Sequence, residues 1–165
     1  MMQSGIMWQK LKTVFPVFMV VFTVSLLLLL FVFKDKLNQW ASTAVKAQAG
    51  ETIQAASAIT IDSLYNYATN GLNYHVTFLE FGAMGCSACK RMEKVMDEIA
   101  ARYPDSVYVI FLNILTPKNQ QLMKYYGVAA IPTQVLLDRN GIEFFRHTGF
   151  YYATDLQKVI SAAKP

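Results

Sequence analysis

Two cysteines, Cys86 and Cys89, are the residues of this sequence with the clearest capacity for chemistry. They are the only cysteines among its 165 residues, and they form the motif Cys86-Ser87-Ala88-Cys89. One such pair excludes a small scaffold held together by several disulfides. The spacing therefore leaves redox chemistry or metal binding as the functions to weigh.

A cysteine pair with this spacing can also serve purposes that involve no redox chemistry. A zinc site needs two further ligands, and the two histidines, His75 and His147, lack the paired spacing of a zinc module. A permanent disulfide across so short a loop would add little stability. Copper binding by both thiolates and two unreactive buried cysteines are further alternatives. We expect redox chemistry, with neither a resident metal nor a cofactor.

The residues around the cysteines predict a strand that leads directly into a helix. Residues 75–81, HVTFLEF, have the composition of a strand, and apolar residues recur on one face from Cys86 to Tyr103. Cys86 would then stand at a helix amino terminus, where unpaired amides and the helix dipole favour a thiolate. Cys89, one turn later, would be more buried. Cys86 is thus predicted to attack and Cys89 to resolve the mixed disulfide.

The remaining elements alternate between helix and strand. We expect a short helix from Asp62 to about Thr69, a central strand at 107–112, a helix at 117–126, strands at 133–137 and 142–146 joined in a hairpin, and a last helix at 153–163. This order predicts an α/β fold with a central mixed sheet flanked by helices.

The amino-terminal part of the chain contains an apolar segment long enough to span a bilayer. Residues 14–33 form a run of twenty residues without a charged side chain. As a helix, this run would cover about 30 Å, the thickness of the hydrocarbon layer. A cleaved signal sequence has a shorter apolar core, and the best cleavage site, Ala47-Gln48-Ala49, lies far beyond the run. We therefore expect a single, uncleaved transmembrane helix.

Charges on the two sides of this run indicate its orientation. Lys10, Lys12 and the amino terminus precede it, whereas Lys34 and Lys36 follow it and are partly offset by Asp35. The larger positive charge favours a cytoplasmic amino terminus and an extracytoplasmic, periplasmic domain. Beyond Lys36 the charges nearly balance, so nucleic acid is not an expected partner.

The predicted organisation has four parts in chain order. They are a cytoplasmic segment at 1–13, the transmembrane helix at 14–33, a spacer at 34–58 that is compatible with a helix, and a globular domain at 59–165.

Two further segments make the sequence resemble the thioredoxin family over about residues 59–163. EFGAMGCSACK, residues 80–90, is similar to the end of a strand and the start of the active-site helix in that family. YGVAAIPT, residues 126–133, is similar to the segment that carries its cis-proline. Asn140-Gly141 and Gly149 fall where its hairpin turn and a following glycine are expected. The resemblance implies a thioredoxin-like fold and a redox-active Cys86–Cys89 disulfide.

The resemblance also implies roles for residues outside the cysteine pair. It implies a cis bond between Ile131 and Pro132, with Ile131, Pro132 and Thr133 forming an edge that binds an extended substrate chain. Glu80 matches the position of a buried aspartate in many thioredoxins. A buried carboxyl there has its pKa raised by desolvation and could accept and return the proton of Cys89. Glutamate at this position resembles membrane-anchored thioredoxins of cytochrome c maturation.

Three residues depart from the pattern of the family. Gly85 stands in place of a tryptophan, Ala88 in place of a proline, and Phe111 in place of a lysine near the buried carboxyl. The dipeptide between the cysteines lacks the histidine of strongly oxidising relatives. This difference favours a reductase or an electron relay.

The sequence therefore predicts a membrane-anchored, extracytoplasmic thioredoxin. It would be a thiol–disulfide oxidoreductase that reduces protein disulfides or relays electrons to them, in cytochrome c maturation or in disulfide homeostasis. Its expected partners are protein disulfide substrates, the membrane and a membrane protein that donates electrons. The alternative is a redox-inactive chaperone or assembly module that holds extended chains at the Pro132 edge.

Overall fold

The computed structural model describes residues 4–163, and for residues 4–14 it describes the backbone alone. Residues 1–3 of the predicted cytoplasmic segment and residues 164–165 of the predicted domain lie outside the described residues. The chain divides into two compact units, Met1–Trp40 and Ala41–Pro165.

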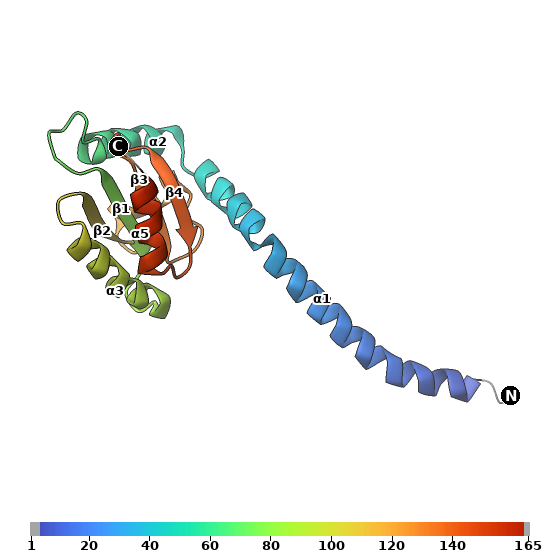
Figure 1. Ribbon diagram of the computed structural model, residues 1–165. Helices are drawn as coiled ribbons and strands as arrows, with labels where there is room; N and C mark the ends of the chain where they lie inside the picture. Colours follow the sequence, from blue (N-terminus) through green and yellow to red (C-terminus); the bar gives the residue numbers. More distant parts are fainter. Residues whose placement is uncertain (1–3, 164–165) are drawn as a thin grey trace. The chain divides into compact units, whose positions relative to one another are not determined.

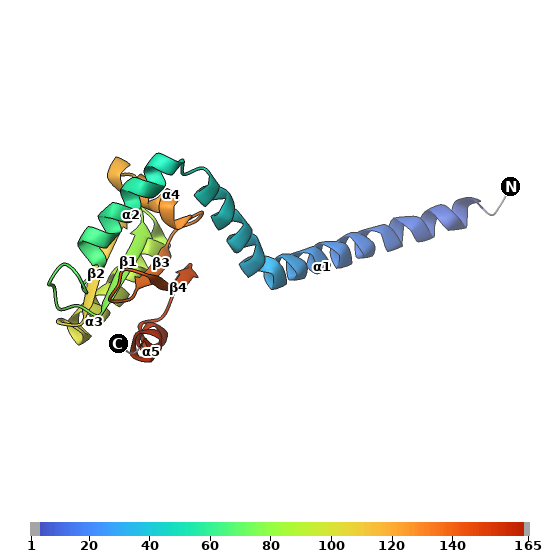
Figure 2. The same cartoon turned by 90° about the horizontal axis from the view of Figure 1, so that it is seen from above.

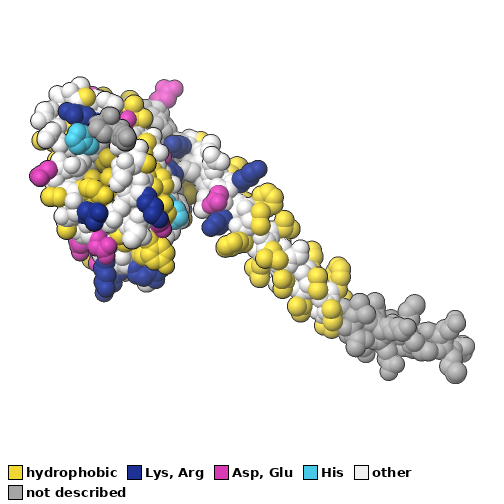
Figure 3. Space-filling model, viewed as in Figure 1, with side chains coloured by type: hydrophobic (Ala, Val, Ile, Leu, Met, Phe, Trp, Pro, Cys, Tyr) yellow, Lys and Arg dark blue, Asp and Glu magenta, His cyan; other side chains and the backbone are white. Residues whose placement is uncertain are grey.

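Helix α1, Ser4–Ala47, contains the apolar segment of the amino-terminal unit (Figure 1). Its part from Phe15 to Ala47 is long and apolar enough to cross a membrane, and the most apolar stretch buries none of its side chains against the protein. In Figure 3, hydrophobic side chains cover much of the described apolar stretch that follows the grey residues. The helix begins well before residue 14 and contains Pro16. By length and composition it fits a membrane span or a signal sequence.

The second unit is built on a mixed sheet of four strands. They are β1, Val76–Gly82, β2, Val107–Asn113, β3, Thr133–Leu137, and β4, Glu143–Thr148. Their order across the sheet is β2-β1-β3-β4. Strand β1 runs parallel to β2 and antiparallel to β3, which pairs antiparallel with β4. The predicted mixed sheet is confirmed.

Strand β2 lies at an edge of the sheet, so its prediction as a central strand is wrong. The apolar run at 107–112 has Tyr108 41% exposed, and among the described residues no strand pairs with its outer side. Strand β1, which contains Thr77 and Glu80, is instead buried along its whole length. An apolar run indicates that helices cover both faces of a strand. Whether the strand is central or at an edge depends on which strands pair with it.

Two helices cover each face of the sheet. Helices α2, Glu51–Tyr65, and α4, Pro117–Tyr126, pack on one face against Leu79, Phe81, Val135 and Leu137. Helices α3, Ser87–Arg102, and α5, Ala153–Ala162, cover the other face with Phe78 and Leu136. Figure 2 shows the two pairs of helices on opposite sides of the strands. The sheet is therefore the middle layer of three, as predicted.

Helix α2 begins at Glu51, within the predicted spacer, and the predicted helix from Asp62 to Thr69 is wrong. Asp62 lies in the last turn, where its carbonyl accepts the backbone N–H of Asn66. Its side chain also accepts the Asn66 amide at 2.8 Å. Asp62 thus helps to end a helix, although its residue type had suggested a beginning.

Candidate active site

Cys86 and Cys89 form a disulfide at the start of α3, with their Cα atoms 5.2 Å apart. Cys86 is the N-cap residue of this helix, and its Sγ accepts a hydrogen bond from the backbone N–H of Cys89 at 3.2 Å. Cys89 is 2% exposed, whereas Cys86 is partly exposed. An incoming sulfur can therefore approach Cys86 while Cys89 stays covered, which is the order of access that disulfide exchange requires.

The loop before Cys86 turns at Gly85, whose φ is +86°. Residues with a side chain rarely adopt this left-handed conformation. The backbone N–H of Cys86 then bonds the carbonyl of Ala83 at 3.2 Å. Gly85 thus lets the chain turn from β1 into α3 where the family has a tryptophan.

Gly82, the last residue of β1, lies against Phe111 and Cys89. A Cβ added at Gly82 would be 2.6 Å from Cε2 of Phe111 and 3.3 Å from Cβ of Cys89. The Phe111 ring therefore fills the space beside Gly82, close to the buried cysteine. Sequence reasoning identified Phe111 as a departure and missed Gly82, although a glycine in a buried strand often marks such a close approach.

The predicted substrate edge lies at the start of β3. The peptide bond between Ile131 and Pro132 is cis, and the Pro132 carbonyl accepts the backbone N–H of Gly149 at 2.8 Å. Thr133 is buried and donates its hydroxyl to the carbonyl of Ala130 at 2.7 Å. Because Thr133 pairs with Phe81, Pro132 lies at the level of Gly82, where β1 ends and the chain leads to the cysteines.

Glu80 is fully buried in the middle of β1. It shares a face of the strand with Gly82, whose missing side chain would point at Cys89, so its carboxyl lies on the side covered by α3. Same-face positions in a strand are about 7 Å apart. Burial raises the pKa of Glu80 to about 8, although a hydrogen bond from Gln134 opposes this shift. A carboxyl with this pKa can exchange a proton near neutral pH.

Gln134 is the polar partner of Glu80 and was missed by sequence reasoning. It is fully buried in β3, directly opposite Glu80, and its Nε2 lies 3.1 Å and 3.4 Å from the two carboxylate oxygens. A polar residue inside an otherwise apolar strand could have indicated it, because a buried polar side chain needs a hydrogen-bond partner.

The two histidines lie at different places in the domain. His75 precedes β1, at the end opposite the cysteines, and His147 lies in β4 with its ring centroid 4.5 Å from that of Tyr151. Within residues 4–163, no group of three or more His, Cys, Asp and Glu side chains is arranged to hold a metal ion.

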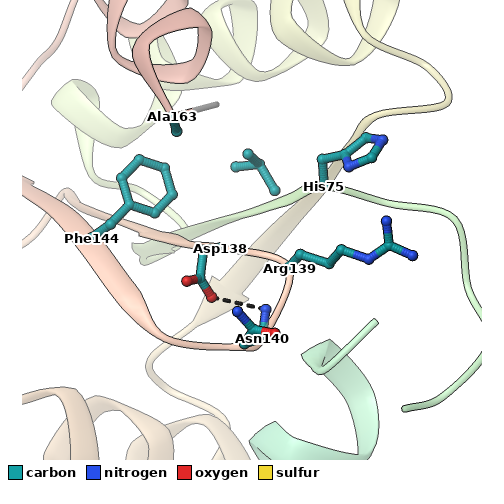
Figure 4. Close-up of a pocket in the computed structure, with 7 residues that line it drawn as sticks. His75, Asp138, Arg139, Asn140, Phe144 and Ala163 are labelled. Carbon is teal, nitrogen blue, oxygen red and sulfur yellow. Dashed lines mark hydrogen bonds between the residues drawn. The ribbon is translucent and has the colours of Figure 1, made fainter. Parts of the chain in front are cut away.

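A cavity of about 340 Å³ lies at the same end of the sheet as His75. Figure 4 shows Phe144 and Arg139 among its lining residues, with the Asp138 carboxylate accepting the backbone N–H of Asn140. Because the cysteines follow the opposite end of β1, this cavity is separate from the redox site.

Comparisons with known proteins match the carboxyl-terminal part of the chain. The model of the thioredoxin-like domain family matches residues 65–164, which is more than half of the chain. Thioredoxin 1 of Synechococcus elongatus is 36% identical over 58 residues, which cover 35% of this chain and 52% of that protein. The chloroplastic thioredoxin-like protein HCF164 of Arabidopsis thaliana is 34% identical over 67 residues, covering 41% and 26%. The thioredoxin of Haemophilus influenzae is 32% identical over 83 residues, covering 50% and 75%.

Solved structures show the same relationship. Thioredoxin-2 of the malaria parasite, described as a component of its protein secretion machinery, matches with a TM-score of 0.50 and 28% identity, covering 53% of this chain and 82% of that one. A mutant thioredoxin of Halobacterium salinarum matches with a TM-score of 0.51 and 24% identity, covering 58% and 80%, which shows the fold alone. The chain spans about half the length of the cyanobacterial thioredoxin that it matches.

The family match and the geometry agree on the chemistry of this site. A bonded Cys-x-x-Cys pair at the start of the helix after β1, together with thioredoxin relatives, supports thiol–disulfide exchange. The resemblance predicted from residues 80–90 and 126–133 is confirmed, and the chain belongs to the thioredoxin-like family.

Proposed function

We propose that this protein is a membrane-tethered thiol–disulfide oxidoreductase that reduces protein disulfides, or relays electrons to them, outside the cytoplasm. One observation carries this proposal. The Cys86–Cys89 disulfide joins a partly exposed sulfur at the start of α3 to a buried sulfur one turn later. This arrangement suits one cysteine that meets substrate and a second that resolves the mixed disulfide.

The reaction starts from the reduced pair and ends with the disulfide. The Cys86 thiolate attacks one sulfur of the substrate disulfide, a mixed disulfide forms, and the first substrate thiolate leaves. The Cys89 thiol then loses its proton as its sulfur attacks Cys86 Sγ, and the second substrate sulfur leaves with the electron pair of the broken bond. The substrate gains two electrons and two protons and becomes two thiols, while the pair is oxidised.

Glu80 supplies the proton transfer in the second step. Its carboxylate takes the proton of the Cys89 thiol as Cys89 attacks, and the carboxylic acid returns that proton to the departing substrate thiolate. Its burial on the face covered by α3, with a pKa of about 8, supports this role because both forms are then accessible near neutral pH.

The substrate chain binds beside Cys86 along the segment that leads into β3. Ala129 and Ala130 are exposed, Ile131 is partly exposed, and Pro132 and Thr133 beneath them are buried. Pairing of Thr133 with Phe81 and Thr148 fixes this segment on both sides. An extended chain can bind such a segment through its backbone, which would accept many different proteins as substrates.

Helix α1 is the membrane tether in this proposal. Its apolar stretch and its exposed side chains support a membrane span. The excess of positive charge before residue 14 supports a cytoplasmic amino terminus. Tethering raises the effective concentration of the domain near other membrane proteins. A membrane protein that carries electrons from the cytoplasm is the donor that we propose, and cytochrome c maturation or general disulfide homeostasis is the process.

The test measures reduction of a protein disulfide by the full-length protein in nanodiscs. Wild type should reduce an insulin disulfide when a dithiol reductant recharges it, and Cys86→Ser should lower the rate to the background. Ser87→Ala, at the exposed residue next to Cys86, is the matched control and should keep the activity. Activity that survives Cys86→Ser would overturn the proposal.

A second measurement addresses orientation and partners in intact cells. An enzyme active only outside the cytoplasm, fused to the carboxyl end, should be active. Cys89→Ser should trap substrates and the electron donor as mixed disulfides on Cys86. Recovery of substrates without any membrane donor would argue against the relay.

A further inference from the structure

One row of side chains crosses all four strands on the face covered by α3 and α5. The register pairs Phe111 of β2 with Glu80 of β1, Glu80 with Gln134 of β3, and Gln134 with His147 of β4. Residues that pair directly across strands present their side chains on the same face. The two middle members of this row, Glu80 and Gln134, are fully buried.

Within this row, Gln134 is the hydrogen-bonding partner of Glu80. Its Nε2 donates to both carboxylate oxygens, at 3.1 Å and 3.4 Å. On the other side of Glu80, Phe111 offers no polar atom. The Oε1 of Gln134 is buried and has no hydrogen-bond partner among residues 4–163. One end of this amide therefore binds the carboxylate, and the other end is an unused acceptor in a place where unpaired acceptors are unfavourable.

In the part of the chain that the structure describes, few titratable groups surround Glu80. Helix α3 contributes Cys89, β2 contributes none at this level, and β4 contributes His147 beyond Gln134. The charged residues of α3 near the cysteines are exposed, and on α5 Lys158 and Asp155 pair with each other at 2.7 Å. Burial and the hydrogen bond from Gln134, rather than a charged side chain, set the pKa of Glu80. The side-chain amide of Gln134 is therefore the polar group that affects this pKa.

We propose that Gln134 is a positioning residue that serves Glu80 in both of its protonation states. When Glu80 is a carboxylate, Nε2 of Gln134 donates to it. When Glu80 is a carboxylic acid, the amide turns by half a rotation, and Oε1 accepts the new O–H. The two ends of a glutamine amide have almost the same shape, so this exchange needs no change in packing. The inference rests on the proposed role of Glu80.

The exchange follows the proton during the second step of the reaction. Cys89 Sγ loses its proton to a Glu80 oxygen and forms a bond with Cys86 Sγ, while the bond from Cys86 Sγ to the substrate sulfur breaks. The substrate sulfur leaves with that electron pair and then takes the proton from Glu80. Gln134 gains and loses no proton. It keeps the buried carboxyl hydrogen-bonded before and after each transfer. Because the hydrogen bond to the charged carboxylate is the stronger of the two, Gln134 also favours ionisation of Glu80.

The first experiment observes the wild-type protein in nanodiscs with the disulfide formed. The side-chain amide signals of Gln134 and the carboxyl carbon of Glu80 are followed by NMR from about pH 6 to about pH 10, a range that brackets the Glu80 pKa. Both should change with one common midpoint. Gln157 on α5 is the matched control and should not follow it. A Gln134 signal that ignores the titration of Glu80 would overturn the proposal.

The second experiment measures the resolving step directly. The reduced protein is mixed with an aromatic nitrobenzoate disulfide, whose first thiol reports attack by Cys86 and whose second reports attack by Cys89. In Gln134→Leu the pKa of Glu80 should rise further, because the hydrogen bond that lowers it is lost. The midpoint of the second phase should move to higher pH. For each pH unit that the midpoint moves, the rate at neutral pH should fall by up to about tenfold.

A double-mutant comparison separates this role from simple packing. In the Glu80→Gln background no carboxyl is left to titrate, so Gln134→Leu should leave the pH profile of the second phase unchanged. An equal change in both backgrounds, or an unchanged profile in the single variant, would contradict the inference. If wild type reduces no disulfide, the proposed function fails, whereas the common midpoint of Gln134 and Glu80 is still tested by NMR.

Discussion

The two faces of the sheet use neighbouring residues of the same strands in different ways. In β1, Leu79 and Phe81 belong to the apolar core beneath α2 and α4, whereas Glu80 between them faces the side of α3. In β3, Val135 likewise belongs to the core beneath α2 and α4, whereas Gln134 lies opposite Glu80 on the side of α3. Both faces are buried, but only the α3 face holds a carboxyl hydrogen-bonded to an amide near the cysteines. The alternation of a strand thus lets one element contribute apolar side chains to the core on one side and a buried titratable carboxyl on the other.

A substitution in the apolar core beneath α2 and α4 should lower stability the most. Leu79→Ala should lower the free energy of unfolding by about 2–5 kcal/mol, because it leaves a cavity at a fully buried position. Disulfide reduction per folded molecule should change little. Denaturant unfolding and insulin reduction, both on the full-length protein, measure the two quantities. Ile59→Ala, at a residue that is 71% exposed, is the control and should change stability by less than about 0.5 kcal/mol.

Glu80, on the face covered by α3, should make the stability of the protein depend on pH. The pKa of Glu80 is about 8 in the folded protein against an ordinary value of 4.5, so the folded state holds this proton more tightly than the unfolded state. Stability should therefore be greatest below about pH 4.5 with respect to this group, and should fall by up to about 1.4 kcal/mol per pH unit as pH rises towards 8.

Glu80→Gln should remove this slope from the unfolding curves of the oxidised protein, in which the cysteines do not titrate. The exposed Glu93→Gln on the adjacent helix is the matched control and should keep it. A slope that is the same in both variants would mean that a group other than Glu80 produces it. The two faces of the sheet would then not differ in how they make stability depend on pH.

At the end of β1, Gly82 lies on the face covered by α3 and leaves room for the Phe111 ring. Gly82→Ala should destabilise the protein by about 1–2 kcal/mol, because its Cβ would meet the Phe111 ring and the Cys89 Cβ. Adding Phe111→Leu should recover part of the loss by making room. Thermal unfolding of the two single variants and the double variant measures this coupling, and strictly additive changes would show that the ring and the glycine do not compete for space.

Local signals in the sequence predicted much of this molecule. The motif at residues 86–89, the helix after it, the helix that Gly127 ends and the hairpin between β3 and β4 all depend on residues close together in the chain. The thioredoxin-like fold followed from two such motifs.

Features that depend on pairing between distant strands were not predicted. The edge position of β2 requires the strand order, and the close approach of Gly82 to Phe111 requires the register between β1 and β2. Gln134 carries no motif of its own. Its importance appears when β3 is placed opposite Glu80, because the amide and the carboxyl then share one buried layer.

The hydrogen bond from the Cys89 backbone to Cys86 Sγ gives this protein a built-in spectroscopic reporter. In the proposed reaction, the sulfur that accepts this amide proton would be, in turn, part of a thiolate, a mixed disulfide and the Cys86–Cys89 disulfide. Its resonance frequency reads the electron density on that sulfur without any attached dye. The populations of these redox states can therefore be followed through one backbone nucleus that takes no part in the proposed chemistry.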